Sequence, residues 1–294
     1  MWRHKMNKSV IWRSSAPQGH WVGDGFPVRT LFSYATPGVQ TSPFLLLDYA
    51  GPHYFAPTTE RHGVGVHPHR GFETVTIVYE GAVEHRDSEG NGGEIGPGDV
   101  QWMTAGRGIL HEEYHAPAFA KTGGVFKVVQ LWVNLPAKDK MVQGGYQTLV
   151  AANIPQVTLA EEAGAARVIA GEMAETKGPA NSFTPINVWD VTLKAGKRVV
   201  LTLPEGHTSM VVGISGVVNI DGQSLAEAEM LLLSPQGTTL TFMAEQESQI
   251  LVLTGEPIEE PVVGQGPFVM NTRDEIRQAV QDYNQGMFGH MAAV

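Results

Sequence analysis

The chain has 294 residues, a length that corresponds to one large or two medium-sized domains. Apolar residues make up 42% of it, which is enough for a packed core and excludes a disordered or collagen-like chain. Aspartate and glutamate (30) outnumber lysine and arginine (20), so the formal net charge is −10 and direct contact with nucleic acid or an anionic membrane is not expected. Cysteine is absent, which excludes disulfide scaffolds, thiolate metal sites and cysteine nucleophiles.

The sequence carries no targeting or membrane-spanning pattern. Segment 1–13 mixes basic residues with isolated apolar ones and is not followed by an apolar stretch. The longest uncharged apolar runs, such as 44–47 and 230–233, are far shorter than the roughly 20 residues that a membrane span needs. We therefore expect a soluble, cytoplasmic and monomeric protein.

Short strand patterns, separated by glycine and proline turns, run through most of the chain. In the first half, 73–79 is β-branched and aromatic, and 125–135 is apolar on both alternating faces, as in a buried strand. In the second half the predicted strands are 187–193, 198–203, 209–214, 217–220, 230–233, 238–243 and 249–254. Regular spacing of this kind favours an all-β sandwich or barrel.

The two halves also resemble each other weakly. The strand end and turn at 78–81 are similar to those at 213–216, and the turn at 95–99 is similar to that at 233–237. Each pair places a strand, a turn and then a proline or glycine turn about one hairpin later. This repetition predicts the duplication of one β-domain.

Two segments fall outside the strand pattern. Residues 159–170 are ambiguous, because alanine and glutamate favour a helix whereas 166–170 can form a strand. Near the C-terminus, Thr272 precedes an acidic first turn and apolar residues at 276, 279, 280 and 283. This pattern predicts a capped amphipathic helix that packs on a barrel.

Histidine is concentrated at the start of the chain, where nine of the eleven lie within the first 115 residues. Residues two apart in extended chain share a face, so His67 and His69 should project together, as should His111 and Glu113, whereas Glu112 should face the other way. If these pairs lie on neighbouring strands, three imidazoles and one carboxylate converge. That donor set suits a divalent transition metal such as Fe, Mn, Ni, Cu or Zn.

Other interpretations of these histidines stay open. An isolated His-x-His motif is more often a surface feature than a metal site. His62, His85 and His115 are better interpreted as hydrogen-bonded or solvent-facing residues. His115 is the nearest rival ligand, because it shares the parity of His111 and Glu113.

Four segments in order resemble the pirin family of the cupin superfamily: HPHRGFETV at 67–75, PGDVQWMTAGRGILHEE at 97–113, QLWVNLP at 130–136 and GPFVMNT at 266–272. The resemblance implies an all-β fold of two tandem cupin (double-stranded β-helix or jelly-roll) barrels with a short C-terminal helix. We expect an N-terminal metal-binding barrel over 1–136 and a C-terminal barrel plus helix over 137–294.

The resemblance also implies one Fe(II) per chain, held in the N-terminal barrel by His67, His69, His111 and Glu113, although other divalent transition metals are possible. General cupins take their carboxylate a few residues after His-x-His, which here would be Glu73. We therefore keep Glu73, with His115, as a candidate for contact with the ligands. No His-x-His follows residue 69, so no metal is expected in the second barrel, and no further cofactor is expected.

In function, the resemblance implies a quercetin 2,3-dioxygenase-like enzyme that cleaves flavonol-type substrates with O2. Glu113, the one anionic ligand, could accept the proton of the substrate hydroxyl. The alternative is an iron-dependent, redox-sensing regulatory protein that acts on a transcription or metabolic protein partner. A third possibility is a stable double-cupin protein whose metal is only structural.

Overall fold

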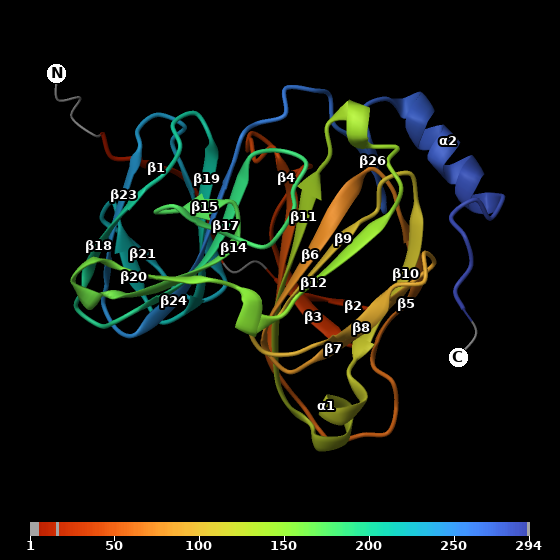
Figure 1. Ribbon diagram of the computed structural model, residues 1–294, viewed down its shortest axis with the longest axis horizontal. Coiled ribbons are helices and arrows are strands. Elements are labelled where there is room, and N and C mark those ends of the chain that lie inside the picture. Colours follow the sequence, from red (N-terminus) through yellow and green to blue (C-terminus); the bar gives the residue numbers. More distant parts are fainter. Residues whose placement is uncertain (1–5, 16–17, 293–294) are drawn as a thin grey trace. The chain divides into compact units, whose positions relative to one another are not determined.

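The chain folds into two compact units, which we call the first and second barrels (Figure 1). The structure is a computed structural model that describes residues 6–15 and 18–292, so part of segment 1–13 lies outside it. Within this range the first barrel consists of 18–34, 44–151 and 258–292, and the second of 6–15, 35–43 and 152–257. Each is built from one seven-stranded and one four-stranded antiparallel sheet, which confirms the predicted all-β pair of cupin domains.

In the first barrel the large sheet has the order β12-β9-β6-β11-β4-β3-β2, and the small sheet has the order β5-β10-β7-β8. The strands are β2 (His20–Val22), β3 (Phe26–Ser33), β4 (Phe44–Phe55), β5 (Gly63–His69), β6 (Phe72–Glu80), β7 (Val83–Asp87), β8 (Gly92–Ile95), β9 (Val100–Thr104), β10 (Ile109–His115), β11 (Gly124–Asn134), β12 (Gly145–Leu149) and the pair β25 (Val263–Gln265) and β26 (Phe268–Met270). The helices are α1 (Pro117–Thr122), α2 (Arg273–Asn284) and the short 3₁₀ turn η1 (Ala137–Asp139).

In the second barrel the large sheet has the order β1-β22-β19-β24-β17-β14-β13, and the small sheet has the order β18-β23-β20-β21. The strands are β1 (Val10–Ser15), β13 (Gln156–Thr158), β14 (Gly164–Ala170), β15 (Glu172–Met173), β16 (Thr176–Lys177), β17 (Ile186–Leu193), β18 (Arg198–Thr202), β19 (Thr208–Ser215), β20 (Val218–Ile220), β21 (Gln223–Leu225), β22 (Glu229–Leu233), β23 (Thr239–Ala244) and β24 (Ser248–Gly255). Two 3₁₀ turns, η2 (Ala151–Asn153) and η3 (Ala160–Glu162), complete the regular elements. The ambiguous segment 159–170 thus contains a short turn and a strand.

The strand orders place β6 and β19 at corresponding positions, and both strands run into a glycine with a left-handed backbone, Gly81 (φ 84°) and Gly216 (φ 73°). A side chain is strained in that conformation, which explains why both turns use glycine. The same comparison matches β9 with β22 and β11 with β24. The weak sequence repeat therefore corresponds to two sheets with the same strand order.

From the sequence we expected a single boundary between the barrels, after residue 136. In the structure each barrel is built from several separate segments of the chain. β1 pairs antiparallel with β22 and is an edge strand of the second barrel, although it lies at the start of the chain. β12 pairs with β9, and β25, β26 and α2 also belong to the first barrel. A strand's partner can lie far away in sequence, so strand patterns alone did not locate these crossings.

The small sheets carry different side chains into the two barrel interiors. In the second barrel, β18 and β23 turn Val199, Leu201, Leu240 and Phe242 into a large apolar core. By sheet order these strands correspond to β5 and β10 of the first barrel, which carry the histidine pairs. The second barrel is therefore filled by hydrocarbon where the first carries imidazoles.

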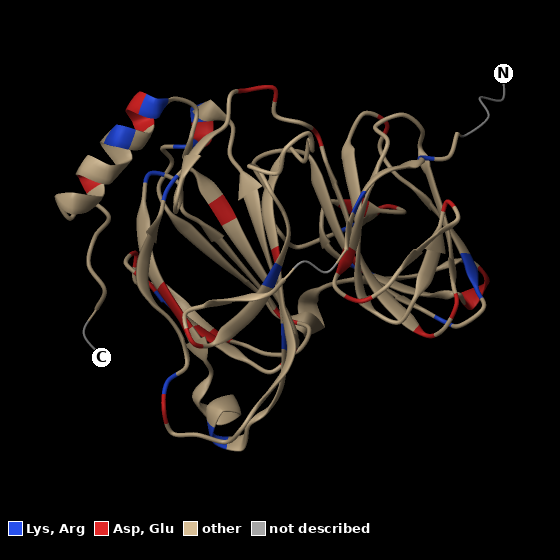
Figure 2. Ribbon diagram, turned by 180° about the vertical axis from the view of Figure 1, so that it is seen from behind, with Lys and Arg blue, Asp and Glu red and all other residues tan. Residues whose placement is uncertain are grey.

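Helix α2 begins with the predicted cap, because the Thr272 hydroxyl accepts from the Glu275 backbone N–H and the Glu275 side chain accepts from the Thr272 backbone. Ile276 and Ala279 are buried in an apolar cluster with β26. Tyr283, predicted on the apolar stripe, is 40% exposed. Charged residues of both signs band the helix in Figure 2.

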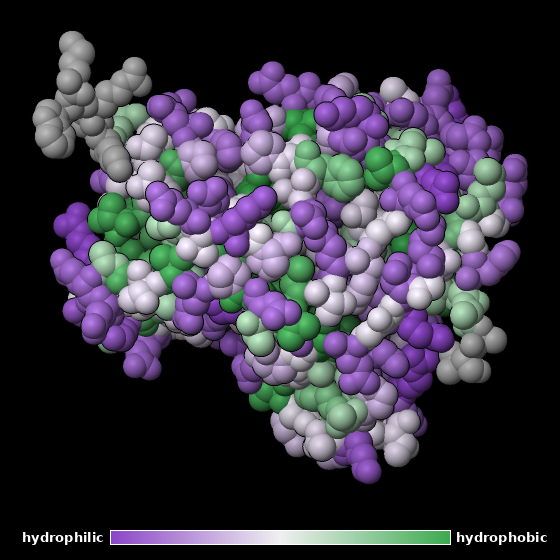
Figure 3. All heavy atoms as spheres, viewed as in Figure 1, coloured by the Kyte–Doolittle hydropathy of each residue, from purple (hydrophilic) through white to green (hydrophobic). Residues whose placement is uncertain are grey.

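The surface is mixed in character. On the face shown in Figure 3, hydrophobic residues form small groups among hydrophilic ones. Neither of the described α-helices has the length and apolar character that crossing a bilayer requires.

Candidate metal centre

Neighbouring strands of the first barrel's small sheet bring the two histidine pairs together. β5 and β10 are antiparallel, with His67 opposite His111 and His69 opposite Ile109. The register shifts between His111 and Glu113, and on its other side Glu113 pairs directly with His85 of β7. The small sheet therefore gathers three histidines from β5 and β10 and a fourth from β7.

His67, His69 and His111 each offer one nitrogen to a group whose three donor atoms lie within 4.8 Å of one another. The ring centroids of His67 and His111 are 4.2 Å apart, and those of His69 and His111 are 4.8 Å apart. Nδ1 of His67 contacts the Gly65 carbonyl oxygen at 2.8 Å, which leaves Nε2 of His67 available. This arrangement can hold a metal ion.

Two of these rings have buried nitrogens that no described residue satisfies. Nδ1 of His69 and Nε2 of His111 are inaccessible to solvent and have no hydrogen-bond partner among the described residues. Unsatisfied buried polar atoms are rare in native proteins and call for an explanation such as an ion. A metal ion bound to these lone pairs would explain both atoms. The residues therefore fit the metal ion that the sequence predicts.

The electrostatic environment keeps the same imidazoles neutral. Burial lowers the pKa of His69 and His111 well below the ordinary value, and the proximity of His67 lowers both further. A hydrogen bond at the Pro267 backbone acts in the opposite direction on His69. Because a metal binds the neutral imidazole, these shifts favour ligation near neutral pH.

Glu113 belongs to a second donor group, with His85 and His111, whose atoms also lie within 4.8 Å of one another. Glu113 is 2% exposed. Its Oε1 accepts from the Gln101 amide at 3.2 Å and from the Thr76 hydroxyl at 3.4 Å. The two groups share His111, so Glu113 lies beside the three-histidine group without being a member of it.

Glu112 makes contacts of a different kind. The Arg86 Nε–H donates to its Oε1 at 2.9 Å, and Arg61 lies 3.7 Å from the same oxygen. Glu112 thus forms ion pairs with arginines, whereas its neighbour Glu113 joins the histidines. Alternation along β10 accounts for this separation.

His85 was not selected from the sequence, yet it is fully buried beside the centre. Its Nδ1 lies 3.4 Å from Nδ1 of His111, and its ring stacks on Tyr146 at 4.8 Å between centroids. The usable signal was the alternation in β7, where Val83, His85 and Asp87 are buried and the residues between them are less so. Sequence alone did not show that β7 pairs with β10.

Glu73 and His115 belong to neither donor group. The Thr104 hydroxyl donates to Oε1 of Glu73 at 2.8 Å, while Oε2 has no partner among the described residues. Burial raises the pKa of Glu73 to about 7. His115 contacts the Gly25 carbonyl oxygen through Nε2 at 2.9 Å and lies among phenylalanines such as Phe55, 4.4 Å between centroids.

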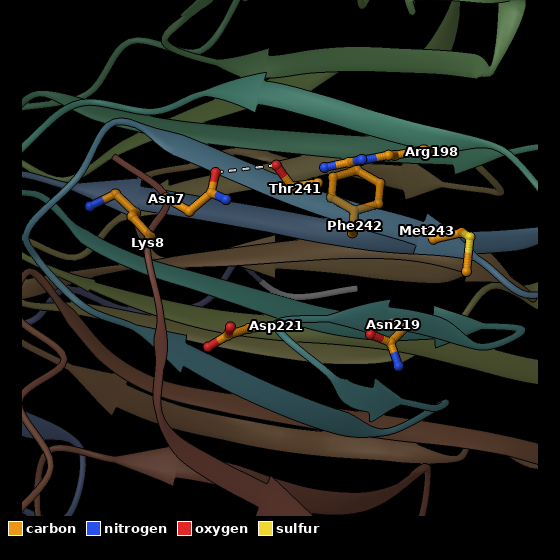
Figure 4. A pocket seen from close by; sticks show the side chains of 8 residues that line it. All are labelled: Asn7, Lys8, Arg198, Asn219, Asp221, Thr241, Phe242 and Met243. Atoms are coloured by element: carbon orange, nitrogen blue, oxygen red, sulfur yellow. Dashed lines mark hydrogen bonds between the residues drawn. The ribbon is translucent and has the colours of Figure 1, made fainter. Parts of the chain in front are cut away.

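The second barrel has a pocket of about 340 Å³ on the strands β18, β20 and β23 (Figure 4). The Thr241 hydroxyl donates to the Asn7 side-chain oxygen at 3.3 Å, and Asp221 accepts the Val10 backbone N–H at 3.1 Å. Its described lining contains one carboxylate and no histidine. Both groups of described residues that could hold a metal ion lie in the first barrel.

Comparison with known proteins gives consistent matches over both barrels. The profile described as Pirin matches residues 25–133, and the profile described as Pirin C-terminal cupin domain matches 188–289. A Pseudomonas aeruginosa protein, provisionally named as a quercetin 2,3-dioxygenase, is 58% identical over 92% of this chain and 94% of its own length.

Solved structures show the same fold. The crystal structure titled quercetin 2,3-dioxygenase from Acinetobacter baumannii has a TM-score of 0.93 and 53% identity, covering 97% of this chain and 99% of that one. A bacterial pirin from Escherichia coli, solved in complex with nickel(II), has a TM-score of 0.66 and 20% identity over 84% of this chain and 99% of its own. At that identity the second likeness shows the fold alone.

Proposed function

The chain belongs to the pirin family, and from that membership we propose that it is a metal-dependent dioxygenase of the quercetin 2,3-dioxygenase type, which cleaves flavonol-type substrates with O2. The names of the Pseudomonas and Acinetobacter relatives support this class of reaction. One observation of this chain carries the proposal: three converging imidazoles, of His67, His69 and His111, include buried lone pairs that no described residue uses.

In this proposal His67, His69, His111 and Glu113 hold one Fe(II) ion per chain, and the same donors are compatible with other divalent transition metals. Bound Fe(II) supplies Lewis acidity toward a substrate oxygen and the redox chemistry that O2 requires. The protein contributes neutral imidazoles and one carboxylate. Its burial of His69 (4% exposed) and His111 (0%) limits competition from water.

Glu113 is the candidate proton acceptor. Its Oε1 is engaged by Gln101 and Thr76, whereas the contact of its Oε2, with the Gln130 amide, is long at 3.4 Å. We assign Oε2 the proton of the flavonol 3-hydroxyl, because it is the less engaged oxygen. A positioned general base contributes about 10²–10⁴-fold to a rate.

Aromatic side chains beside the centre suit an aromatic substrate. The partly exposed Trp132 lies 5.4 Å from His69 between ring centroids and stacks on Phe72 at 4.3 Å. Offset or edge contacts with aromatic rings are favourable by about 0.5–1.5 kcal/mol beyond the area they bury. In our proposal Trp132 offers this surface to one ring of the flavonol.

The test is anaerobic reconstitution with Fe(II), followed by quercetin and O2. The expected result is loss of quercetin with release of stoichiometric carbon monoxide. H111A, treated identically, is the matched control for quercetin oxidation by unbound iron. An iron-loaded wild-type protein that consumes no quercetin, or that releases no carbon monoxide, would show that the proposed reaction is wrong.

A further inference from the structure

Gln101 places an amide against two members, His85 and Glu113, of the second donor group of the metal centre. It lies in β9, every residue of which is buried, and it is itself 0% exposed. Its Nε2 is 3.0 Å from Nδ1 of His85 and 3.2 Å from Oε1 of Glu113. An amide nitrogen carries two hydrogens, so both contacts can be donated at once.

The orientation of this amide is fixed from its other end. The Tyr146 hydroxyl donates to Oε1 of Gln101 at 3.4 Å, and the Tyr146 ring lies almost parallel to that of His85, at an interplanar angle of 14°. A flipped amide would turn its oxygen toward the Glu113 carboxylate and its hydrogens toward the hydroxyl. The three partners therefore select a single orientation.

This contact determines which nitrogen of His85 carries the proton. Because Nδ1 accepts from Gln101, the proton of a neutral His85 lies on Nε2. Nε2 faces Oδ2 of Asp87 at 3.6 Å, which is too long for a hydrogen bond, and it has no hydrogen-bond partner among the described residues. Nδ1 is therefore the nitrogen of His85 that a protein hydrogen bond engages.

The same contact affects where a cation can lie. One donor group is His67, His69 and His111, and the other is His85, His111 and Glu113. Both groups include His111. A single ion bound to His111 therefore lies either with His67 and His69 or with His85 and Glu113. The second position needs one nitrogen of His85 and one oxygen of Glu113. The Gln101 amide contacts Nδ1 of His85 and Oε1 of Glu113, one atom of each residue.

We infer that Gln101 is a positioning residue that decides between these two overlapping metal positions. Its amide engages Nδ1 of His85 and Oε1 of Glu113, so that the ion binds with His67 and His69. This inference rests on the proposed metal site, and it adds a residue that touches no metal itself. Removing the two N–H donors should let His85 become a ligand.

The direct test is ¹⁵N NMR of the zinc-loaded full chain with labelled histidine. Long-range ¹H–¹⁵N spectra distinguish protonated, free and zinc-bound ring nitrogens, and H85Q assigns the resonances of His85. In the wild type we expect Nε2 of His85 to be protonated and Nδ1 to be free of zinc. A zinc-bound His85 in the wild type would overturn the inference without any further variant.

Two variants test the cause. Q101L and Q101M keep a side chain of similar size but remove both donors, and we expect Nδ1 of His85 to shift to the zinc-bound position in each. H85F combined with Q101L should return the spectrum to the wild-type set of zinc-bound histidines. Y146F, which keeps the stacked ring, should give a mixture of the two states. If His85 remains free of zinc in folded Q101L and Q101M, Gln101 does not select the position.

The same spectra separate this inference from the proposed function. If His67, His69 and His111 bind zinc in the wild type but the Gln101 variants behave like it, the inference fails and the metal site stands. If none of the three binds zinc in the wild type, the proposed metal site itself fails. If quercetin cleavage is not observed but the zinc spectrum is as expected, the proposed reaction fails and both the metal site and the inference stand.

Discussion

Replacing Glu73 with glutamine should remove a pH-dependent destabilisation of the first barrel. Glu73 is 1% exposed, with one oxygen bonded to Thr104 and the other without a partner among the described residues. Burial raises the pKa of this carboxyl from 4.5 to about 7, because ionisation would leave a charge without solvent. In the unfolded chain the same carboxyl returns to its ordinary pKa.

The difference of about 2.5 pH units between folded and unfolded states corresponds to about 3 kcal/mol, since each unit is worth about 1.4 kcal/mol. Below pH 4.5 both states are protonated, and the group causes no destabilisation. Between 4.5 and about 7 the unfolded state releases its proton first, so the free energy of unfolding falls as the pH rises. Above about 7 the loss is complete.

Urea unfolding of metal-free protein from pH 4.5 to 8 measures this effect. The wild type should lose about 3 kcal/mol more than Glu73→Gln over that range, because the amide cannot ionise and still accepts from Thr104. Any constant cost of the substitution cancels in the pH dependence. Glu94→Gln, at an exposed position, is the matched control and should follow the wild type. Equal pH dependence in wild type and Glu73→Gln would refute the reasoning.

Three further predictions concern the centre and its surroundings. His69→Ala and His111→Ala should each lose most of the bound metal while far-UV circular dichroism stays unchanged, because the barrel has its own apolar core; unfolding of either would make the metal structural. Glu113→Gln should lower quercetin turnover by about 10²–10⁴-fold while iron content measured by mass spectrometry falls far less; full turnover with retained iron would remove Glu113 from the reaction. Asp282→Ala should lower the free energy of unfolding by about 3–5 kcal/mol in urea titrations, because it leaves the buried Arg70 guanidinium, 2.7 Å away, without its carboxylate; a change below 1 kcal/mol would contradict this.

Strand parity predicted part of the metal centre from sequence. It paired His67 with His69 and separated Glu113 from Glu112, because alternate residues of a strand face opposite sides. Parity does not measure distance along the strand. His115 shares the parity of His111, but four residues of extended chain span about 13 Å, which places it among phenylalanines instead.

The sequence could not predict which residues are neighbours across paired strands, and the reason is physical. His85 joins the centre because β7 pairs with β10, and which strands pair depends on the whole barrel and not on either strand's own sequence. The same reason applies to the boundary between the barrels. The fold class was predictable because glycine turns and alternating apolar residues act locally, whereas β1 and β12 are assigned by distant partners.

The pairing of β1 with β22 has a consequence for how the protein is made. Trp12 lies opposite Leu232, so the strand that leaves the ribosome among the first has a partner that is synthesised more than 200 residues later. Until then β1 cannot complete its sheet, and the outer edge of β22 has no protecting neighbour in a chain that lacks β1. Open edges of this kind promote association between chains. A protein shortened at its N-terminus should therefore aggregate during expression, even though the strand lies far from every residue of the metal centre in the sequence.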